Sequence, residues 1–240
     1  MNFKAAIFDL DGTLVDSYKA WEKAYKKILK NANHDMTDEE FLELYRMTVE
    51  ESGEYFRELR RAGRIVIPGA AGGGVGGSAN DAGGGYMEAF TKRIFSDIRK
   101  EMETLYETDA PGKPYALDYV KSLYEKGVPL CVATLTPSAL SEPSLRKTGF
   151  FRYMDFVITS DDVGLSKKFP DIFLEAAKRL GAAPGEAAVF EDCPTAMETA
   201  RKAGFKVCGV SDIHRTYDVA EVSRLCDWYI TDFRAAPDPA

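Results

Sequence analysis

Two aspartates that directly follow a short apolar segment are the residues in this sequence best suited to chemistry. Ala5–Phe8 predicts a buried β-strand, and Phe8 to Thr13 then reads F-D-L-D-G-T. An Asp-Gly pair alone is typical of an ordinary turn. Asp9 and Asp11, however, place two carboxylates one residue apart at a strand end, without an obvious basic neighbour in the sequence. A hard divalent cation would relieve their repulsion, so the pattern indicates a metal-dependent site.

The same residues resemble motif one of the haloacid dehalogenase superfamily, in particular of its phosphatases. The resemblance implies that Asp9 is the nucleophile that attacks phosphorus. It implies that Asp11 protonates the leaving oxygen, later activates water, and lends its backbone carbonyl to Mg²⁺. Gly12 and Thr13 are expected to contact the transferred phosphate. A carboxylate nucleophile divides a difficult hydrolysis into two in-line displacements, and the metal neutralises charge as the reactants meet.

Motif two of the superfamily requires Ser or Thr at the end of a core strand, where the hydroxyl holds a phosphate oxygen. Thr134 follows the apolar run Leu130–Ala133 and is similar to this motif. The resemblance implies that the backbone amide of Leu135 is a second phosphate donor.

Motif three requires a lysine that neutralises both the nucleophile and the phosphate. Ser166 to Asp171 reads S-K-K-F-P-D, which resembles the G-K-P-x-P-D of the superfamily before a helix. Alignment on Pro170 and Asp171 makes Lys167 the catalytic and phosphate-binding candidate. Lys168 stands where proline is usual, so either lysine fits the role at this point.

Motif four requires acidic residues after a later core strand. Ala187–Phe190 is followed by Glu191 and Asp192, and the segment F-E-D-C-P-T-A-M-E-T-A-R-K-A-G resembles this motif. The resemblance implies that Asp192 binds Mg²⁺, with Glu191 as a second ligand or as its support. Cys193 and Ala196 depart from the usual Ser and Gly, and both leave the carboxylates in place.

Strand-like and helix-like segments alternate around these motifs. The expected strands are Ala5–Phe8, Leu130–Thr134, Phe156–Thr159, Ala187–Phe190, Lys206–Val210 and Trp228–Ile230. The expected helices between them are Pro114–Lys126, Ala139–Thr148, Pro170–Leu180, Thr195–Ala203 and Tyr217–Leu225. Such alternation predicts an α/β fold, a Rossmann-like doubly wound parallel sheet with helices on both faces. Ligands of these sheets bind beyond the carboxyl ends of the strands, where the motifs lie.

A block that is helical throughout interrupts this alternation from Ser17 to about Tyr106. We expect it to be an all-helical cap inserted into the core, with the core at 1–16 and 110–240 and the cap at 17–109. A glycine-rich tract at 68–85 is expected to be a flexible linker between two cap helices. Its G-x-G-x-x-G match lacks the strand–turn–helix context of a dinucleotide site.

An inserted helical cap resembles the first cap type of the superfamily (C1), found in phosphoglycolate phosphatases, sugar phosphatases and β-phosphoglucomutase. Such caps close over the site and read the leaving group, which implies a hinge around Val15–Ser17 and Thr108–Gly112. Arg46 lies near a segment that resembles the cap specificity region, where it is either a substrate contact or an ordinary surface arginine. Trp21 replaces a histidine that mutases use near the hinge, which weighs against a mutase.

Composition limits the partners. The chain has 240 residues, 45% of them hydrophobic, and a formal net charge of −7, which argues against nucleic acid or an anionic membrane as partner. No apolar run reaches the roughly 18 residues of a membrane span, and no secretory leader is evident. Four cysteines without C-x-x-C spacing indicate reduced thiols and a cytoplasmic protein, and two histidines exclude a histidine-rich metal site. We expect a monomer or homodimer that acts on a small phosphate ester.

The motifs together predict a Mg²⁺-dependent phosphatase that hydrolyses a small phosphomonoester through a phospho-aspartate on Asp9. A phosphomutase of the β-phosphoglucomutase type is the first alternative. A dehalogenase is disfavoured, because that chemistry needs neither Mg²⁺ nor Asp11. A non-catalytic phosphate-binding protein on the same fold is the alternative outside enzymes.

Overall fold

The computed structural model of the chain describes residues 2–47, 49–66, 85–163, 166–214 and 217–240. The chain divides into two compact units. One unit combines Met1–Tyr18 with Tyr106–Ala240, and the other is Lys19–Leu105.

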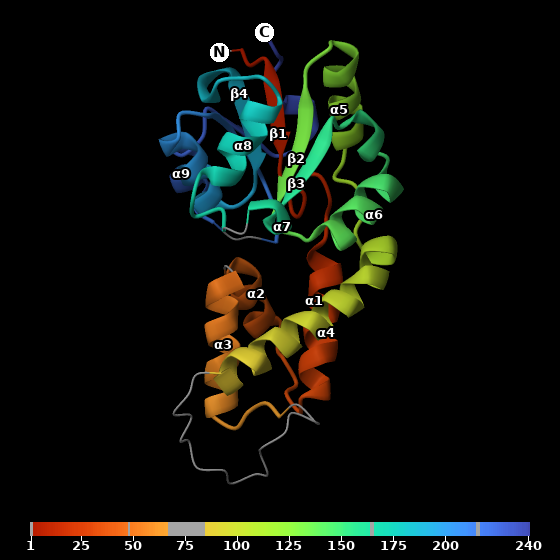
Figure 1. The fold of residues 1–240 in the computed structure, drawn as a ribbon, viewed down its shortest axis with the longest axis vertical. Helices are drawn as coiled ribbons and strands as arrows, with labels where there is room; N and C mark the ends of the chain where they lie inside the picture. Colours follow the sequence, from red (N-terminus) through yellow and green to blue (C-terminus); the bar gives the residue numbers. More distant parts are fainter. Residues whose placement is uncertain (1, 48, 67–84, 164–165, 215–216) are drawn as a thin grey trace. The chain divides into compact units, whose positions relative to one another are not determined.

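The first unit is built on a six-stranded, all-parallel sheet with the order β3-β2-β1-β4-β5-β6. Figure 1 labels β1, β2, β3 and β4 of this sheet. The sheet confirms the predicted α/β class, and all six strands form where the apolar runs place them. Only β4 differs, because it extends one residue further, to Glu191. The strands are β1 Ala5–Phe8, β2 Leu130–Thr134, β3 Phe156–Thr159, β4 Ala187–Glu191, β5 Lys206–Val210 and β6 Trp228–Ile230.

Strand β1 lies in the middle of the sheet and is buried on both faces. Ala6 and Phe8 pack into one apolar cluster with α5 and α6, whereas Ala5 and Ile7 pack into another with α8, α9 and α10. Figure 1 shows α5 and α6 on one side of the sheet and α8 and α9 on the other. The helices are α5 Ala116–Glu125, α6 Ser138–Thr148, α7 Ser160–Val163, α8 Asp171–Arg179, α9 Pro194–Lys202 and α10 Val219–Ser223. Alternation along β1 therefore anchors both helical layers.

The elements of the second unit are all helices among its described residues. They are α1 Tyr18–Asn31, α2 Asp38–Arg46, α3 Val49–Arg61 and α4 Gly85–Asp109, of which α1 and α4 continue into the first unit. A buried stripe on α4 consists of Phe90, Ile94, Ile98 and Met102, at the spacing of one helical face. Residues 67–84, which hold nearly all of the glycine-rich tract, lie outside the described residues, and Gly85 opens α4. No helix among the described residues is both long and apolar enough to cross a membrane.

The two chain segments at the expected hinge pair with each other in the first unit. Val15 forms an isolated antiparallel bridge with Gly112. The amide of Asp16 donates to the carbonyl of Pro111 at 2.8 Å, and that of Lys113 donates to the carbonyl of Leu14 at 2.8 Å. These bonds fix the loop after β1 against the segment that leads back into the sheet.

Candidate active site

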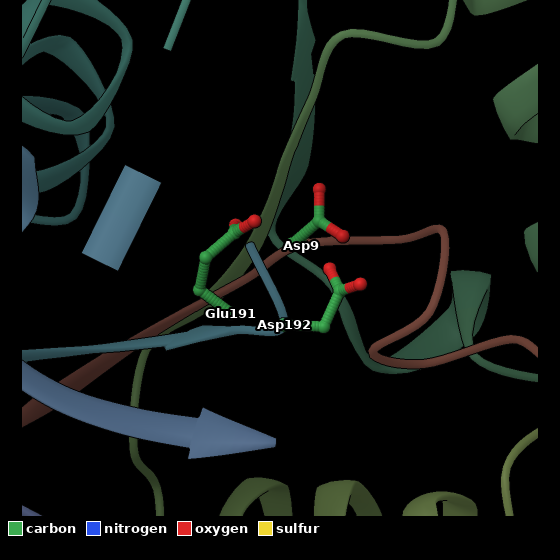
Figure 2. A group of neighbouring side chains, drawn as sticks. All are labelled: Asp9, Glu191 and Asp192. Carbon is green, nitrogen blue, oxygen red and sulfur yellow. The ribbon is translucent and has the colours of Figure 1, made fainter. Parts of the chain in front are cut away.

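Three buried carboxylates meet where β1 and β4 end. Asp9 follows β1, Glu191 is the last residue of β4, and Asp192 comes next. Because β1 and β4 are paired neighbours, with Phe8 opposite Phe190, their carboxyl ends coincide. One carboxylate oxygen from each residue lies within 4.8 Å of the others. Figure 2 shows the three carboxyl groups side by side at the strand ends, and we call them the acidic cluster.

Lys167 joins the acidic cluster. Its Nζ donates hydrogen bonds to Oδ1 of Asp9 and, at 2.8 Å, to Oε2 of Glu191. The lysine side chain is buried and lies 5.7 Å from the centroid of the Phe173 ring. Lys168 is exposed. Of the two lysines that the sequence left open, Lys167 is therefore the one that the fold brings to Asp9.

The electrostatics of this group are unbalanced. Lys167 bonds two of the three carboxylates, and its single positive charge could not balance the cluster if all three were ionised. Burial raises the pKa of Asp9, against the opposing attraction of Lys167. Burial raises the pKa of Glu191 to about 8, and the charge of Asp9 adds to the effect. For Lys167, burial disfavours the charged form, but the charges of Asp9 and Glu191 outweigh burial and raise the pKa.

The donor set fits Mg²⁺. Carboxylate oxygens are ligands that this hard cation prefers, and its two positive charges would offset the formal surplus of the fully ionised cluster over Lys167. Gly12 keeps the space beside Asp192 clear, because its φ is +86° and an added Cβ would lie 2.7 Å from Cγ of Asp192. The same Cβ would lie 3.1 Å from Oδ2 of Asp212. The loop can therefore approach these carboxylates only with glycine at this position.

Asp11 occupies a separate position beside this cluster. Its carboxylate accepts a hydrogen bond from the Tyr106 hydroxyl on Oδ1 and another from Thr136 Oγ1 on Oδ2, both at 2.5 Å. The loop that carries Asp11 is tight, because the amides of Leu14 and Val15 both donate to the carbonyl of Leu10. The side chain of Asp11 is not part of the acidic cluster, and the role expected for its backbone carbonyl stays a prediction.

The residues expected to bind phosphate lie along the same edge of the sheet. Thr134 ends β2, is buried, and accepts the amide of Thr136 on Oγ1 at 3.1 Å. Leu135 follows and is half-buried. Thr13 is fully buried, and its hydroxyl has no hydrogen-bond partner among the described residues. Their contacts with phosphate stay a prediction.

Arg46, the candidate substrate contact, is the last residue of α2 in the second unit. Its side chain lies outside the described part of the structure. The predicted contact with the substrate therefore stays a prediction.

Sequence reasoning missed three residues of the site. Tyr106 and Thr136 are the partners of Asp11, and Asp212 lies beside Gly12. Asp212 is buried, and its carboxylate lies 3.7 Å from Nζ of Lys113. Thr136 and Asp212 each lie two residues beyond the end of a predicted strand, and this position could have identified them as candidate site residues. No feature of the sequence indicates Tyr106.

The sequence is similar to those of known hydrolases. The family described as "Hydrolase: haloacid dehalogenase-like hydrolase" matches residues 3–204. A phosphorylated carbohydrates phosphatase of Thermotoga maritima is 29% identical over 205 residues, covering 85% of this chain and 82% of the relative. A fructose-1-phosphate phosphatase of Escherichia coli is 26% identical, covering 87% of this chain and 96% of the relative.

The fold is also similar to that of solved structures. The crystal structure of CbbY from Rhodobacter sphaeroides in complex with phosphate superposes with a TM-score of 0.74 at 21% identity. The superposition covers 97% of this chain and 96% of that one. With the family match over most of its length, the chain belongs to the haloacid dehalogenase-like hydrolases.

Proposed function

We propose that this protein is a Mg²⁺-dependent phosphatase that hydrolyses a small phosphomonoester through a phospho-aspartate on Asp9. The observation that carries the proposal is the buried Asp9 carboxylate, bonded to Lys167 and flanked by Glu191 and Asp192 at the strand ends. The phosphatase activities named for the Thermotoga maritima and Escherichia coli relatives support the same reaction class.

In the first step a carboxylate oxygen of Asp9 attacks phosphorus. The new O–P bond forms as the ester P–O bond breaks, and Asp11 gives a proton to the departing alkoxide. In the second step water attacks phosphorus, Asp11 takes its proton, and phosphate leaves as Asp9 is regenerated. Lys167 offsets the negative charge of Asp9 and of the phosphoryl oxygens that approach it. Thr134, the Leu135 amide, Gly12 and Thr13 would hold those oxygens.

Asp9, Asp192, Glu191 and the backbone carbonyl of Asp11 would hold Mg²⁺, which neutralises charge on the phosphoryl group when bound. Glu191 is also suited to a supporting role. Its Oε1 accepts the Cys193 amide at 3.3 Å, while its Oε2 accepts Lys167. These two bonds fix the carboxylate beside Asp192 whether or not it contacts the metal.

We infer the class of substrate from the names of the relatives and from the charge of the chain. The relatives' names point to a small phosphorylated metabolite of carbohydrate type, and Arg46 is the candidate contact for its leaving group. The net charge of −7 does not suit nucleic acid or an anionic membrane as partner. A cytoplasmic monomer or homodimer completes the proposal.

The test is phosphate release from a panel of small phosphate esters, with Mg²⁺ or with a chelator, by the wild type and Asp9→Asn. We expect Mg²⁺-dependent release that Asp9→Asn abolishes, because the amide keeps the shape and loses the nucleophile. Substantial release by a folded Asp9→Asn protein would rule out the covalent route. Faster interconversion of sugar phosphates than release of phosphate would indicate a mutase, and binding without turnover a non-catalytic protein.

A further inference from the structure

We propose that Tyr106 and Thr136 are positioning residues that orient the Asp11 carboxylate for proton transfer, an inference that rests on the proposed function. Each residue donates a hydroxyl hydrogen bond to a different oxygen of Asp11. Tyr106 bonds Oδ1 and Thr136 bonds Oδ2, both at 2.5 Å. Neither residue belongs to the acidic cluster.

Asp11 needs such partners because its own torsions do not fix it. The terminal torsion of an aspartate side chain is broad and roughly two-fold, so the carboxylate plane is set by what it contacts. With a donor on each oxygen, rotation of this plane breaks two hydrogen bonds at once. Both donors are buried, with 1% of Tyr106 and 6% of Thr136 exposed, so water does not readily replace them.

The backbone holds the two donors in place. Thr136 lies two residues after β2, and its amide is bonded to Thr134 Oγ1 at 3.1 Å. Tyr106 lies in the last turn of α4, shortly before the segment whose Gly112 pairs with Val15. Three separate parts of the chain, the loop after β1, the end of β2 and the end of α4, therefore converge on one carboxylate.

The orientation of an acid matters in proportion to how much the leaving oxygen needs a proton. An alkoxide is strongly basic and needs the proton as the ester bond breaks, whereas 4-nitrophenolate leaves without one. The ratio kcat/KM reports the steps up to the first phosphoryl transfer, in which Asp11 acts as the acid. A positioning role therefore predicts that loss of either hydroxyl lowers kcat/KM for an alkyl phosphate much more than for 4-nitrophenyl phosphate.

The experiment compares Tyr106→Phe and Thr136→Val with the wild type, using the best alkyl phosphate of the panel and 4-nitrophenyl phosphate. We expect kcat/KM for the alkyl ester to fall about tenfold in each variant, a part of the ~10²–10⁴ that a positioned acid contributes. For 4-nitrophenyl phosphate, kcat/KM should fall less than about threefold, because this leaving group needs no proton from Asp11. Thr136→Ser keeps the hydroxyl and should restore the alkyl rate.

Two matched controls remove a hydroxyl bond elsewhere in the same unit. The Tyr119 hydroxyl donates to the Pro237 carbonyl at 2.7 Å, and Thr148 Oγ1 donates to the Ser144 carbonyl at 2.7 Å. Tyr119→Phe and Thr148→Val should leave the alkyl-to-aryl ratio unchanged.

If kcat/KM fell equally for both esters, Tyr106 and Thr136 would have a merely structural role. If kcat/KM were unchanged for both, the two hydroxyls would have no role in the reaction. Either result overturns the inference. So would a Thr136→Ser variant as slow as Thr136→Val. A wild type without activity on either ester would instead overturn the proposed function, and the basis of the positioning role with it.

Discussion

Lys167 and Asp9 are hydrogen-bonded in the buried centre of the site although 158 residues separate them in the sequence. Asp9 reaches this place as the residue after β1. Lys167 reaches it from the segment that leads into α8, whose Ile172 and Phe173 pack in the same apolar cluster as Ile7 of β1. The packing of α8 against the central strand therefore brings the two residues together. Lys167 then provides the positive charge beside the buried Asp9 carboxylate.

We predict that Lys167→Ala lowers kcat/KM by at least about a hundredfold, because a buried charge that offsets the nucleophile and the phosphate is lost. Lys168→Ala is the matched control, since Lys168 is adjacent in sequence but exposed. The test is to measure kcat/KM for both variants by steady-state kinetics, with thermal unfolding to show that each variant is folded. A larger loss in Lys168→Ala would mean that the assignment of the motif is wrong.

We predict that Gly12→Ala both destabilises the protein and weakens its response to Mg²⁺. A residue with Cβ costs about 1–2 kcal/mol in the left-handed conformation, and here the Cβ would also press on Asp192. Gly127 provides the control, because its φ is +74° but nothing lies within 4 Å of an added Cβ. Gly127→Ala should show the loss in unfolding temperature alone, while Gly12→Ala also loses Mg²⁺-dependent activity. Equal activity in the two variants would contradict the role given to Gly12.

The sequence predicts the sheet well because each strand is a short, continuous apolar run between helical patterns. Once the strands are known, Asp9, Thr134, Glu191 and Asp192 must share one edge, since parallel strands align their carboxyl ends. Asp11 shows the limit of this reasoning. Tyr106 lies 95 residues away along the chain, and no periodicity indicates which buried hydroxyl will meet a given carboxylate. Such pairs depend on how whole elements pack, so only the structure reveals them.

We predict that Asp192→Asn weakens Mg²⁺ binding by at least the ~10–100-fold that loss of a supporting residue costs in metal sites. The change removes one of the three carboxylates of the acidic cluster. Asp155→Asn is a control, because its carboxylate accepts the Leu130 amide at 2.8 Å at the start of β2, away from the acidic cluster. Calorimetric titration of the chelator-treated proteins with Mg²⁺ measures the affinity of each variant and of the wild type. Equal affinity in Asp192→Asn and wild type would remove Asp192 from the metal site.

The metal-free protein should lose stability as pH rises from about 5 to 8. Burial raises the pKa of Glu191 from 4.5 to about 8, so between these values the folded state holds a proton that the unfolded state has released. The free energy of unfolding therefore falls with pH across this window. The raised pKa of Lys167 does not alter the sign, because its contribution is fully present below 10.5.

The measurement is the unfolding temperature in the presence of chelator at a series of pH values from about 5 to 8, which gives the slope of stability against pH. Glu191→Gln should make the fall of unfolding temperature with pH shallower, and the raised pKa of Asp9 accounts for the part that remains. Glu198→Gln, at an exposed surface ion pair with Lys202, should leave the slope unchanged. Mg²⁺ binds the deprotonated carboxylates, so the rise in unfolding temperature that it produces should be larger at pH 8 than at about pH 5. A metal-free wild type whose slope equals that of Glu191→Gln would mean that Glu191 is already ionised throughout this range, with Lys167 alone sufficient to compensate it.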